Sequence, residues 1–237
     1  TTITDTLPPT LSITSPLSGI ATNQAVAVTG RTVDNSAGNV TLEIRVDNRA
    51  PLRVSVVAGS NFSVPLNLPL DGSADGLHTV QVLAIDTFGN RSFAHTLTVT
   101  LDTRRPTVSL SLDPTSDTGT IGDSTTALET VTLVGQTDPN RPVRLSTGAT
   151  TNTDSLGRFR FINIPLSVGQ NAFTATSTDS AGNVGTGSVN LILLPDITPP
   201  VLTITQPTNN LQTTSSVTVL GQVTDDRSGQ LLVELTL

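Results

Sequence analysis

The sequence predicts an all-β protein, and three observations point to this class. Thr and Ser are abundant, and Val and Leu dominate the apolar residues. Apolar and polar residues alternate over short runs, which 18 Gly and 15 Pro residues punctuate. No stretch shows the sustained i, i+3, i+4 apolar spacing of an amphipathic helix. Alternating runs bounded by turn residues are typical of strands with one buried face.

The chain repeats itself at three junctions of similar form. They read DTLPP, DTRRP and DITPP, and they end at Pro9, Pro106 and Pro200. Each junction precedes a short alternating run and then a second run that closes on a glycine, at Gly30, Gly135 and Gly221. Such self-similarity indicates copies of one module.

The repeat divides the chain into modules. Residues 1–5 match the end of a preceding repeat, and the rest forms module 1 (6–102), module 2 (103–196) and a partial module 3 (197–237). We expect the chain to be cut from a longer array at both ends.

Module 1 contains seven strand-like runs, and module 2 repeats their order. Seven short strands in about 95 residues are the pattern of an immunoglobulin-like β-sandwich. With no Cys and no Trp, the core must come from aliphatic residues and Phe. The runs lie near residues 10–14, 25–31, 40–47, 52–57, 61–68, 78–85 and 93–101, and the Phe residues expected in the core are Phe62, Phe159, Phe161 and Phe173.

The order of segments in module 2 resembles a known family. SLDPTSDTGTIGDST is followed by TLVGQTDPNRPVRL, TDSLGRFRF and GQNAFTATSTDSAGN. This order resembles the bacterial Ig-like repeats of large secreted adhesins and biofilm-associated surface proteins. Module 1 resembles them more loosely, since it lacks the SDTGTIGD segment. The resemblance implies an extracellular or cell-surface location and Ca²⁺ sites at repeat boundaries.

The motif Asp-x-x-Gly-Asn occurs twice, as DTFGN at 86–90 and DSAGN at 179–183. Both copies fall in the predicted turn between the last two strands of a sandwich, the F–G turn. Glycine supplies the positive φ that a tight turn needs, and the Asp carboxylates can cap neighbouring backbone N–H groups.

Further acidic residues are expected at the same end of each sandwich, where the B–C loop, the F–G turn and the entering linker meet. Three converging carboxylates repel one another unless a cation lies between them, and a set of oxygen ligands suits Ca²⁺. The candidate ligands are Asp5, Asp34 and Asp86 for module 1, Asp102, Asp138 and Asp179 for module 2, and Asp196 with Asp225 or Asp226 for module 3.

Competing interpretations of these acids stay open at this point. The same Asp residues can serve only as turn caps. Arg104 and Arg105 can neutralise the acids of the second junction directly. The acidic segment at residues 113–123 either adds ligands near Asp196 or forms a solvated loop.

Composition argues against several function classes. The net charge is -7 and all 12 positive residues are Arg, without a basic cluster to bind nucleic acid or anionic lipid. No apolar run is long enough for membrane insertion. The only imidazoles, His78 and His95, are expected at surface strand positions, and no catalytic motif accompanies them. We therefore expect no catalysis.

The sequence favours a spacer or stalk segment of an extracellular bacterial adhesin or matrix protein, stiffened by Ca²⁺ at its junctions. Its expected partners are neighbouring Ig-like repeats of the same or other chains. One alternative is a direct binding module for a glycan or protein, for which Phe88 is the expected exposed aromatic contact. Another is a filament subunit whose partial module is completed by a strand from another chain.

Overall fold

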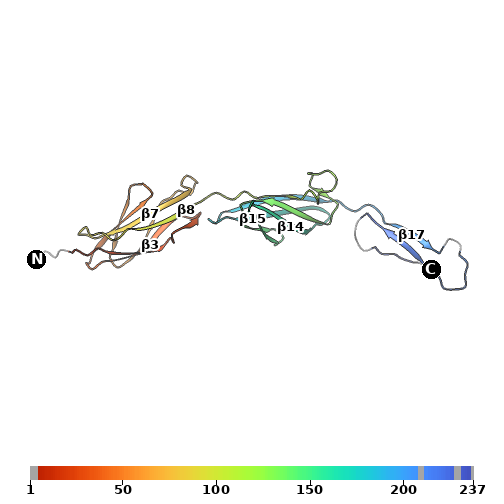
Figure 1. Cartoon of the computed structure of the whole chain (residues 1–237), viewed down its shortest axis with the longest axis horizontal. Coiled ribbons are helices and arrows are strands. Elements are labelled where there is room, and N and C mark those ends of the chain that lie inside the picture. Colours follow the sequence, from red (N-terminus) through yellow and green to blue (C-terminus); the bar gives the residue numbers. More distant parts are fainter. Residues whose placement is uncertain (1–4, 208–210, 227–230, 236–237) are drawn as a thin grey trace. The chain divides into compact units, whose positions relative to one another are not determined.

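The computed structural model describes residues 5–207, 211–226 and 231–235. Every regular element in these residues is a strand (Figure 1), and none of them forms a helix long and apolar enough to cross a membrane. The strands are β1 (Thr10–Ser15), β2 (Ile20–Thr22), β3 (Ala27–Val33), β4 (Asn39–Val46), β5 (Leu52–Val57), β6 (Asn61–Pro65), β7 (Gly76–Ile85), β8 (His95–Leu101), β9 (Ser109–Leu112), β10 (Thr125–Thr126), β11 (Thr130–Gln136), β12 (Pro142–Leu145), β13 (Thr150–Asn152), β14 (Arg158–Pro165), β15 (Gly169–Thr178), β16 (Val184–Leu193), β17 (Val201–Gln206) and β18 (Leu220–Thr224).

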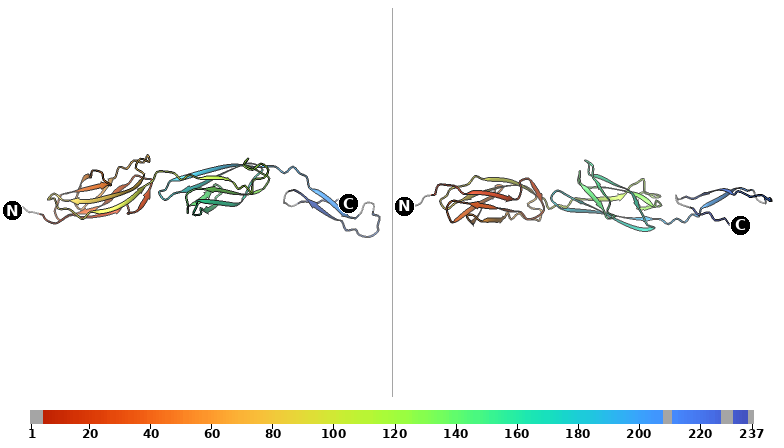
Figure 2. Two further views of the ribbon diagram at one scale, coloured as in Figure 1. Left: turned by 45° about the horizontal axis from the view of Figure 1, so that its top comes forward. Right: turned by 90° about the horizontal axis from the view of Figure 1, so that it is seen from below.

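Modules 1 and 2 have the same sheet topology. In module 1 the sheets have the orders β1-β3-β6 and β2-β8-β7-β4-β5, and in module 2 the orders are β9-β11-β14 and β10-β16-β15-β12-β13. The two sets therefore match strand for strand, and Figure 2 gives two further views of them. This arrangement confirms the predicted all-β, immunoglobulin-like class.

The chain forms two compact units, and their limits differ from the limits of the repeated modules. One unit comprises residues 1–111, 134–161 and 173–189, and the second comprises residues 112–133, 162–172 and 190–237. The boundary between the units passes through the strands of module 2.

The first strand of each sandwich is divided between the two sheets. In module 1, β1 pairs antiparallel with β3, whereas β2 pairs parallel with β8. The short β2 was not among the seven predicted runs, because three residues after a turn give no detectable alternation. Module 2 repeats the division with β9 and β10.

The core of module 1 is filled from both sheets. Val28 and Phe62 come from one sheet and Leu42, Val82 and Val99 from the other, and all five belong to one buried apolar cluster. Each such side chain contributes about 1.5–3 kcal/mol when it is fully buried. The four Phe residues predicted in the core are buried, with 3–7% of their surface exposed: Phe62, Phe159, Phe161 and Phe173.

The glycine that recurs near the end of the second run permits close packing of the first strand. A Cβ on Gly30 would clash with the carbonyl oxygen of Ser12 and the ring of Phe62. A Cβ on Gly135 would clash in the same way with Ser109 and Phe159. The repeated glycine therefore reflects a steric requirement of the sandwich.

His78 is a correction to the sequence prediction, which placed it at the surface. Its side chain is buried, with Nδ1 2.8 Å from Oδ2 of Asp47 and Nε2 2.7 Å from the carbonyl oxygen of Ala74. The backbone N–H of Thr79 donates to the other oxygen of Asp47. Alternation along β7 did place position 78 on one face, but the sequence could not show that a carboxylate from the β4–β5 turn covers it. His95 is exposed, as predicted.

The described part of module 3 contains the two-stranded sheet of β17 and β18, drawn in blue in Figures 1 and 2. Leu202 pairs with Val223 and Ile204 with Gly221, in the same register as Leu11 with Thr32 and Ile13 with Gly30 in the β1–β3 pair of module 1. Leu202 is 51% exposed, whereas its counterparts Leu11 and Val108 are buried. Completion of this module by a strand from another chain stays a prediction.

Gly30→Ala and Gly135→Ala are each expected to lower the free energy of unfolding by about 1–3 kcal/mol, because the added methyl group forces a packed strand or ring to move. Chemical denaturation followed by circular dichroism measures the effect. Ser55→Ala on the exposed face of β5 is the control and should change stability by less than about 0.5 kcal/mol. Unchanged stability in both glycine variants would contradict this account.

The hydrogen bonds of Asp47 predict that module 1 loses stability in acid. The hydrogen bond from His78 lowers the pKa of the Asp47 carboxyl, aided by the Thr79 N–H and despite partial desolvation. A lowered folded-state pKa stabilises the fold above the unfolded value of about 3.9, and the contribution is lost as the pH falls through the folded value. Asp47→Asn should therefore flatten the fall in stability between about pH 5 and pH 2, measured by denaturation at each pH.

Candidate functional site

Both copies of Asp-x-x-Gly-Asn form the same hydrogen-bonded turn. Oδ1 of Asp86 accepts the backbone N–H groups of Phe88 and Asn90, at 2.9 and 2.8 Å. Oδ1 of Asp179 accepts those of Ala181 and Asn183 at the same two distances. The glycines Gly89 and Gly182 have φ of 89° and 94°. The predicted turn caps are thus confirmed in detail.

The Asn that ends the motif joins the turn to the linker. Nδ2 of Asn90 donates to Oδ2 of Asp86 at 2.7 Å and to the carbonyl oxygen of Asp5 at 3.1 Å. Nδ2 of Asn183 donates to Oδ2 of Asp179 and to the carbonyl oxygen of Asp102, both at 2.8 Å. One amide therefore binds the turn carboxylate and the entering backbone together, and we call this contact the linker clamp.

The clamp of module 1 lies beside a cluster of three carboxylates. Asp5, Asp34 and Asp86 each offer an oxygen within 4.8 Å of the others. Two oxygens of these carboxylates, Oδ2 of Asp5 and Oδ1 of Asp34, are buried and have no hydrogen-bond partner. An unsatisfied buried carboxylate oxygen is costly, so this cluster has the donor atoms and the unfilled coordination that a divalent cation requires.

The remaining oxygens of the cluster are held in place by protein donors. Oδ1 of Asp5 accepts the backbone N–H of Leu7 and the amide of Asn35, and Oδ2 of Asp34 accepts the hydroxyl of Ser36. The Leu7 hydrogen bond lowers the pKa of Asp5 below its ordinary value. Asp5 therefore keeps its negative charge at neutral pH, which favours a cation.

Module 2 does not assemble the same cluster among the described residues. Asp179 and Asp102 are tied to Asn183 as in module 1, but Asp138 is exposed and does not group with them. Counting from the repeated glycine shows why. Asp34 is four residues after Gly30, whereas the fourth residue after Gly135 is Pro139, so module 2 has no carboxylate at the matching position.

The second junction is instead held by hydrogen bonds. The backbone N–H of Asn23 donates to the carbonyl of Ala181, and its Nδ2 donates to Oδ1 of Asn183. In the linker, the N–H of Thr103 donates to Asp75. The guanidinium of Arg104 lies beside Asp75, with its Nε 3.8 Å from Oδ2, and the backbone N–H of Arg104 donates to Oδ1 of Asp102.

A hydrogen-bonded turn also keeps Asp179 charged. Burial alone would raise the pKa of this carboxyl, but hydrogen bonds from the Asn183 side chain and from the backbone of residues 181–183 bring it below its ordinary value. Protein hydrogen bonds therefore stabilise the charged form of Asp179.

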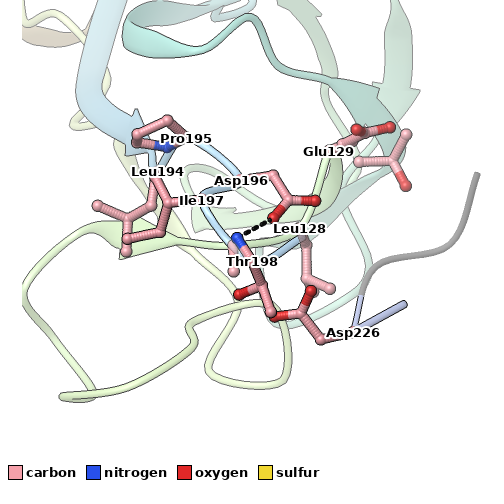
Figure 3. A pocket seen from close by; sticks show the side chains of 10 residues that line it. Leu128, Glu129, Leu194, Pro195, Asp196, Ile197, Thr198 and Asp226 are labelled. Carbon is pink, nitrogen blue, oxygen red and sulfur yellow. Dashed lines mark hydrogen bonds between the residues drawn. The ribbon is translucent and has the colours of Figure 1, made fainter. Parts of the chain in front are cut away.

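Module 3 brings a second acidic cluster together. Asp196, Asp225 and Asp226 offer oxygens within 4.8 Å of one another, and Asp225, like Asp34, is the fourth residue after the repeated glycine. Asp196 and Asp226 line a pocket with Glu129 and Leu128. Figure 3 shows these side chains around it, together with the hydrogen bond from the Thr198 N–H to Asp196.

The sequence prediction missed the two residues that organise the site. Neither Asn90 nor Asn183 is assigned a role by the sequence prediction, although the Asn that closes both copies of the motif is the signal that marks them. The prediction also allowed the segment at 113–123 to supply ligands near Asp196. In the described residues the acids that group with Asp196 are Asp225 and Asp226.

Asn183→Ala is expected to lower the free energy of unfolding by about 1–3 kcal/mol, because it leaves partly buried acceptors of Asp179 and Asp102 without a donor. Asn90→Ala should behave similarly in module 1. Thermal and chemical denaturation measure the loss. Asn140, exposed at the B–C loop, offers a control as Asn140→Gly, which keeps the positive φ of 55° accessible. An equal loss in the control would refute the clamp.

Residues 104–193 match the family model described as bacterial Ig-like domain. No curated protein sequence gives a match.

Three solved structures are similar to the chain. The fibronectin(III)-like modules of Clostridium thermocellum CbhA are 15% identical, with 78% of this chain and 94% of that chain covered and a TM-score of 0.43. A tetra-tandem repeat in the extending region of a large adhesion protein is 22% identical, with 92% and 62% covered and a TM-score of 0.32. A 1.5-MDa bacterial ice-binding adhesin is 23% identical, with 79% and 65% covered and a TM-score of 0.41.

The family match covers most of module 2, and module 1 has the same order of strands. Residues 104–193 are thus a bacterial Ig-like domain.

Proposed function

We propose that the chain is a non-catalytic spacer segment of an extracellular bacterial adhesin or matrix protein, with Ca²⁺ bound at the entrances of modules 1 and 3. The bacterial Ig-like match of residues 104–193 supports the class of protein and its extracellular location. The linker clamp supports the spacer role, because the same amide fixes the entering backbone in both complete modules.

The observation that carries the calcium proposal is the pair of buried, unpartnered oxygens of Asp5 and Asp34 beside Asp86. Three carboxylates supply part of the six to eight oxygens that Ca²⁺ takes, and water or backbone carbonyls complete the set. The cluster at Asp196, Asp225 and Asp226 is more exposed, so we expect it to bind more weakly. Module 2 needs no ion, since hydrogen bonds satisfy its turn.

A calorimetric Ca²⁺ titration tests this proposal. We expect two binding events, of which Asp34→Asn removes the tighter and Asp225→Asn the weaker. At a free Ca²⁺ concentration 100 times the Kd, the tighter site should add about 2.7 kcal/mol to the free energy of unfolding of module 1.

Asp138→Asn is the matched control, because Asp138 was predicted as a ligand yet lies outside both clusters. It should leave both binding events unchanged. Small-angle scattering with Ca²⁺ and with chelator then tests the spacer role, since a stiffened linker narrows the distribution of particle lengths. Absence of heat, or wild-type binding by Asp34→Asn, would reject the metal sites.

A further inference from the structure

Two of the six Phe residues are exposed, and both lie in module 1. Phe88 is 50% exposed and Phe93 is 94% exposed, whereas the other four are buried. Alternation along the last strand does not explain a phenylalanine ring almost fully in water. Such a residue often marks a binding surface when other features accompany it.

Phe93 lines a groove of about 550 Å³. The groove runs between the start of the first strand and the segment before β8, and its lining includes Pro8, Pro9, Leu11, Arg91 and His95. This volume lies within the usual range for small-molecule sites. Two proline rings and a phenylalanine ring give it apolar walls.

A β-bulge turns Phe93 outward. His95 pairs with Val82, but Ser92 bonds with Ala84, through its N–H to the Ala84 carbonyl and through its hydroxyl to the Ala84 N–H. Between these two pairs, one residue of β7, Leu83, therefore faces two on the other side, Phe93 and Ala94. Bulges of this kind redirect side chains and are common beside functional sites.

The matching segment of module 2 is built differently. Counting from the shared motif, Arg91, Phe93 and His95 correspond to Val184, Thr186 and Ser188, and β16 runs unbroken from Val184 to Leu193. A Cβ on Gly185 or Gly187 would clash with the carbonyls of Pro106 and Val108. The two glycines thus let the first strand lie close, whereas Ser92 and Ala94 stand at these positions in module 1.

The charge of the groove selects for an anion. Arg91 and His95 are exposed, no acidic residue lines the groove, and neither side chain forms an ion pair within the described residues. This is a local positive site on a chain of net charge -7. A guanidinium binds carboxylates through paired hydrogen bonds.

The shape of the groove favours a sugar over an extended peptide. A peptide that adds as a strand needs backbone donors along the edge, and Pro8 and Pro9 have no N–H to give. A pyranose instead uses flat apolar surfaces, on which its own apolar face stacks, together with polar groups at its edge. Phe93 and the prolines supply the surfaces, and Arg91 and His95 supply the polar groups.

From these observations we propose that the groove of module 1 binds an acidic polysaccharide, with a uronic acid ring stacked on Phe93 and its carboxylate paired with Arg91. The site is separate from the acidic clusters and goes beyond the spacer role. It would let a module within the chain contact a carbohydrate matrix directly.

Titration of the whole chain with oligogalacturonate, followed by ¹⁵N NMR in the presence of chelator, tests the proposal. Chelator removes Ca²⁺, so the outcome does not depend on the metal sites. We expect saturable shifts at residues 91–95, and Phe93→Ala and Arg91→Gln should each weaken binding by about tenfold or more, as for loss of a charge-assisted contact.

Phe88→Ala and Arg49→Gln are matched controls, because each removes an exposed residue of the same type outside the groove. Both should bind as the unmodified chain does, and neutral dextran should not bind. Three results would overturn the proposal: no saturable binding, equal binding by Phe93→Ala and Arg91→Gln, or equally tight binding of poly-glutamate, which would indicate an acidic protein partner.

Discussion

The contact on which the entrance of each module depends is the amide of Asn90 or Asn183. The turn positions this amide, because the Asp carboxylate of the motif accepts a hydrogen bond from the backbone N–H of the same Asn. The amide then holds the backbone carbonyl of the linker. In module 1 this brings the carboxylate of Asp5 to Asp34 and Asp86. It also fixes where the chain enters, shortly before the prolines of the groove. The acidic cluster of module 1 depends on this contact.

Modules 1 and 2 use the same clamp with different surroundings. Module 1 has two buried oxygens without partners, a situation that a cation relieves. Module 2 lacks the third carboxylate, and Asn23 donates to its turn instead. The entrance of module 1 therefore has buried carboxylate oxygens without partners, whereas Pro139 stands in module 2 at the position that matches Asp34. This difference is why we assign ions to particular junctions rather than to all of them.

The fold could be predicted from the sequence because its signals are local and repeated. The alternation of apolar and polar residues predicted the strands. The recurring glycine predicted the positions, Gly30 and Gly135, at which the first strand packs closely. The candidate site was only partly predictable. Asp138 looked equivalent to Asp34, but counted from the repeated glycine it comes one residue earlier, and Pro139 stands at the matching position. The burial of His78 and the outward turn of Phe93 depend on a distant carboxylate and on a bulge, and neither leaves a local pattern.

The clamp recognises a carbonyl group and not a side chain of the linker. Every residue presents the same carbonyl, so a linker can change its sequence at that position without losing the bond. Asp5 and Asp102 happen to be identical, yet the hydrogen bond would survive a different residue at either place. In a tandem array joined in this way, the linker residues can change and gain or lose ligands for ions. Each module still keeps its hydrogen bond to the backbone of the segment that precedes it.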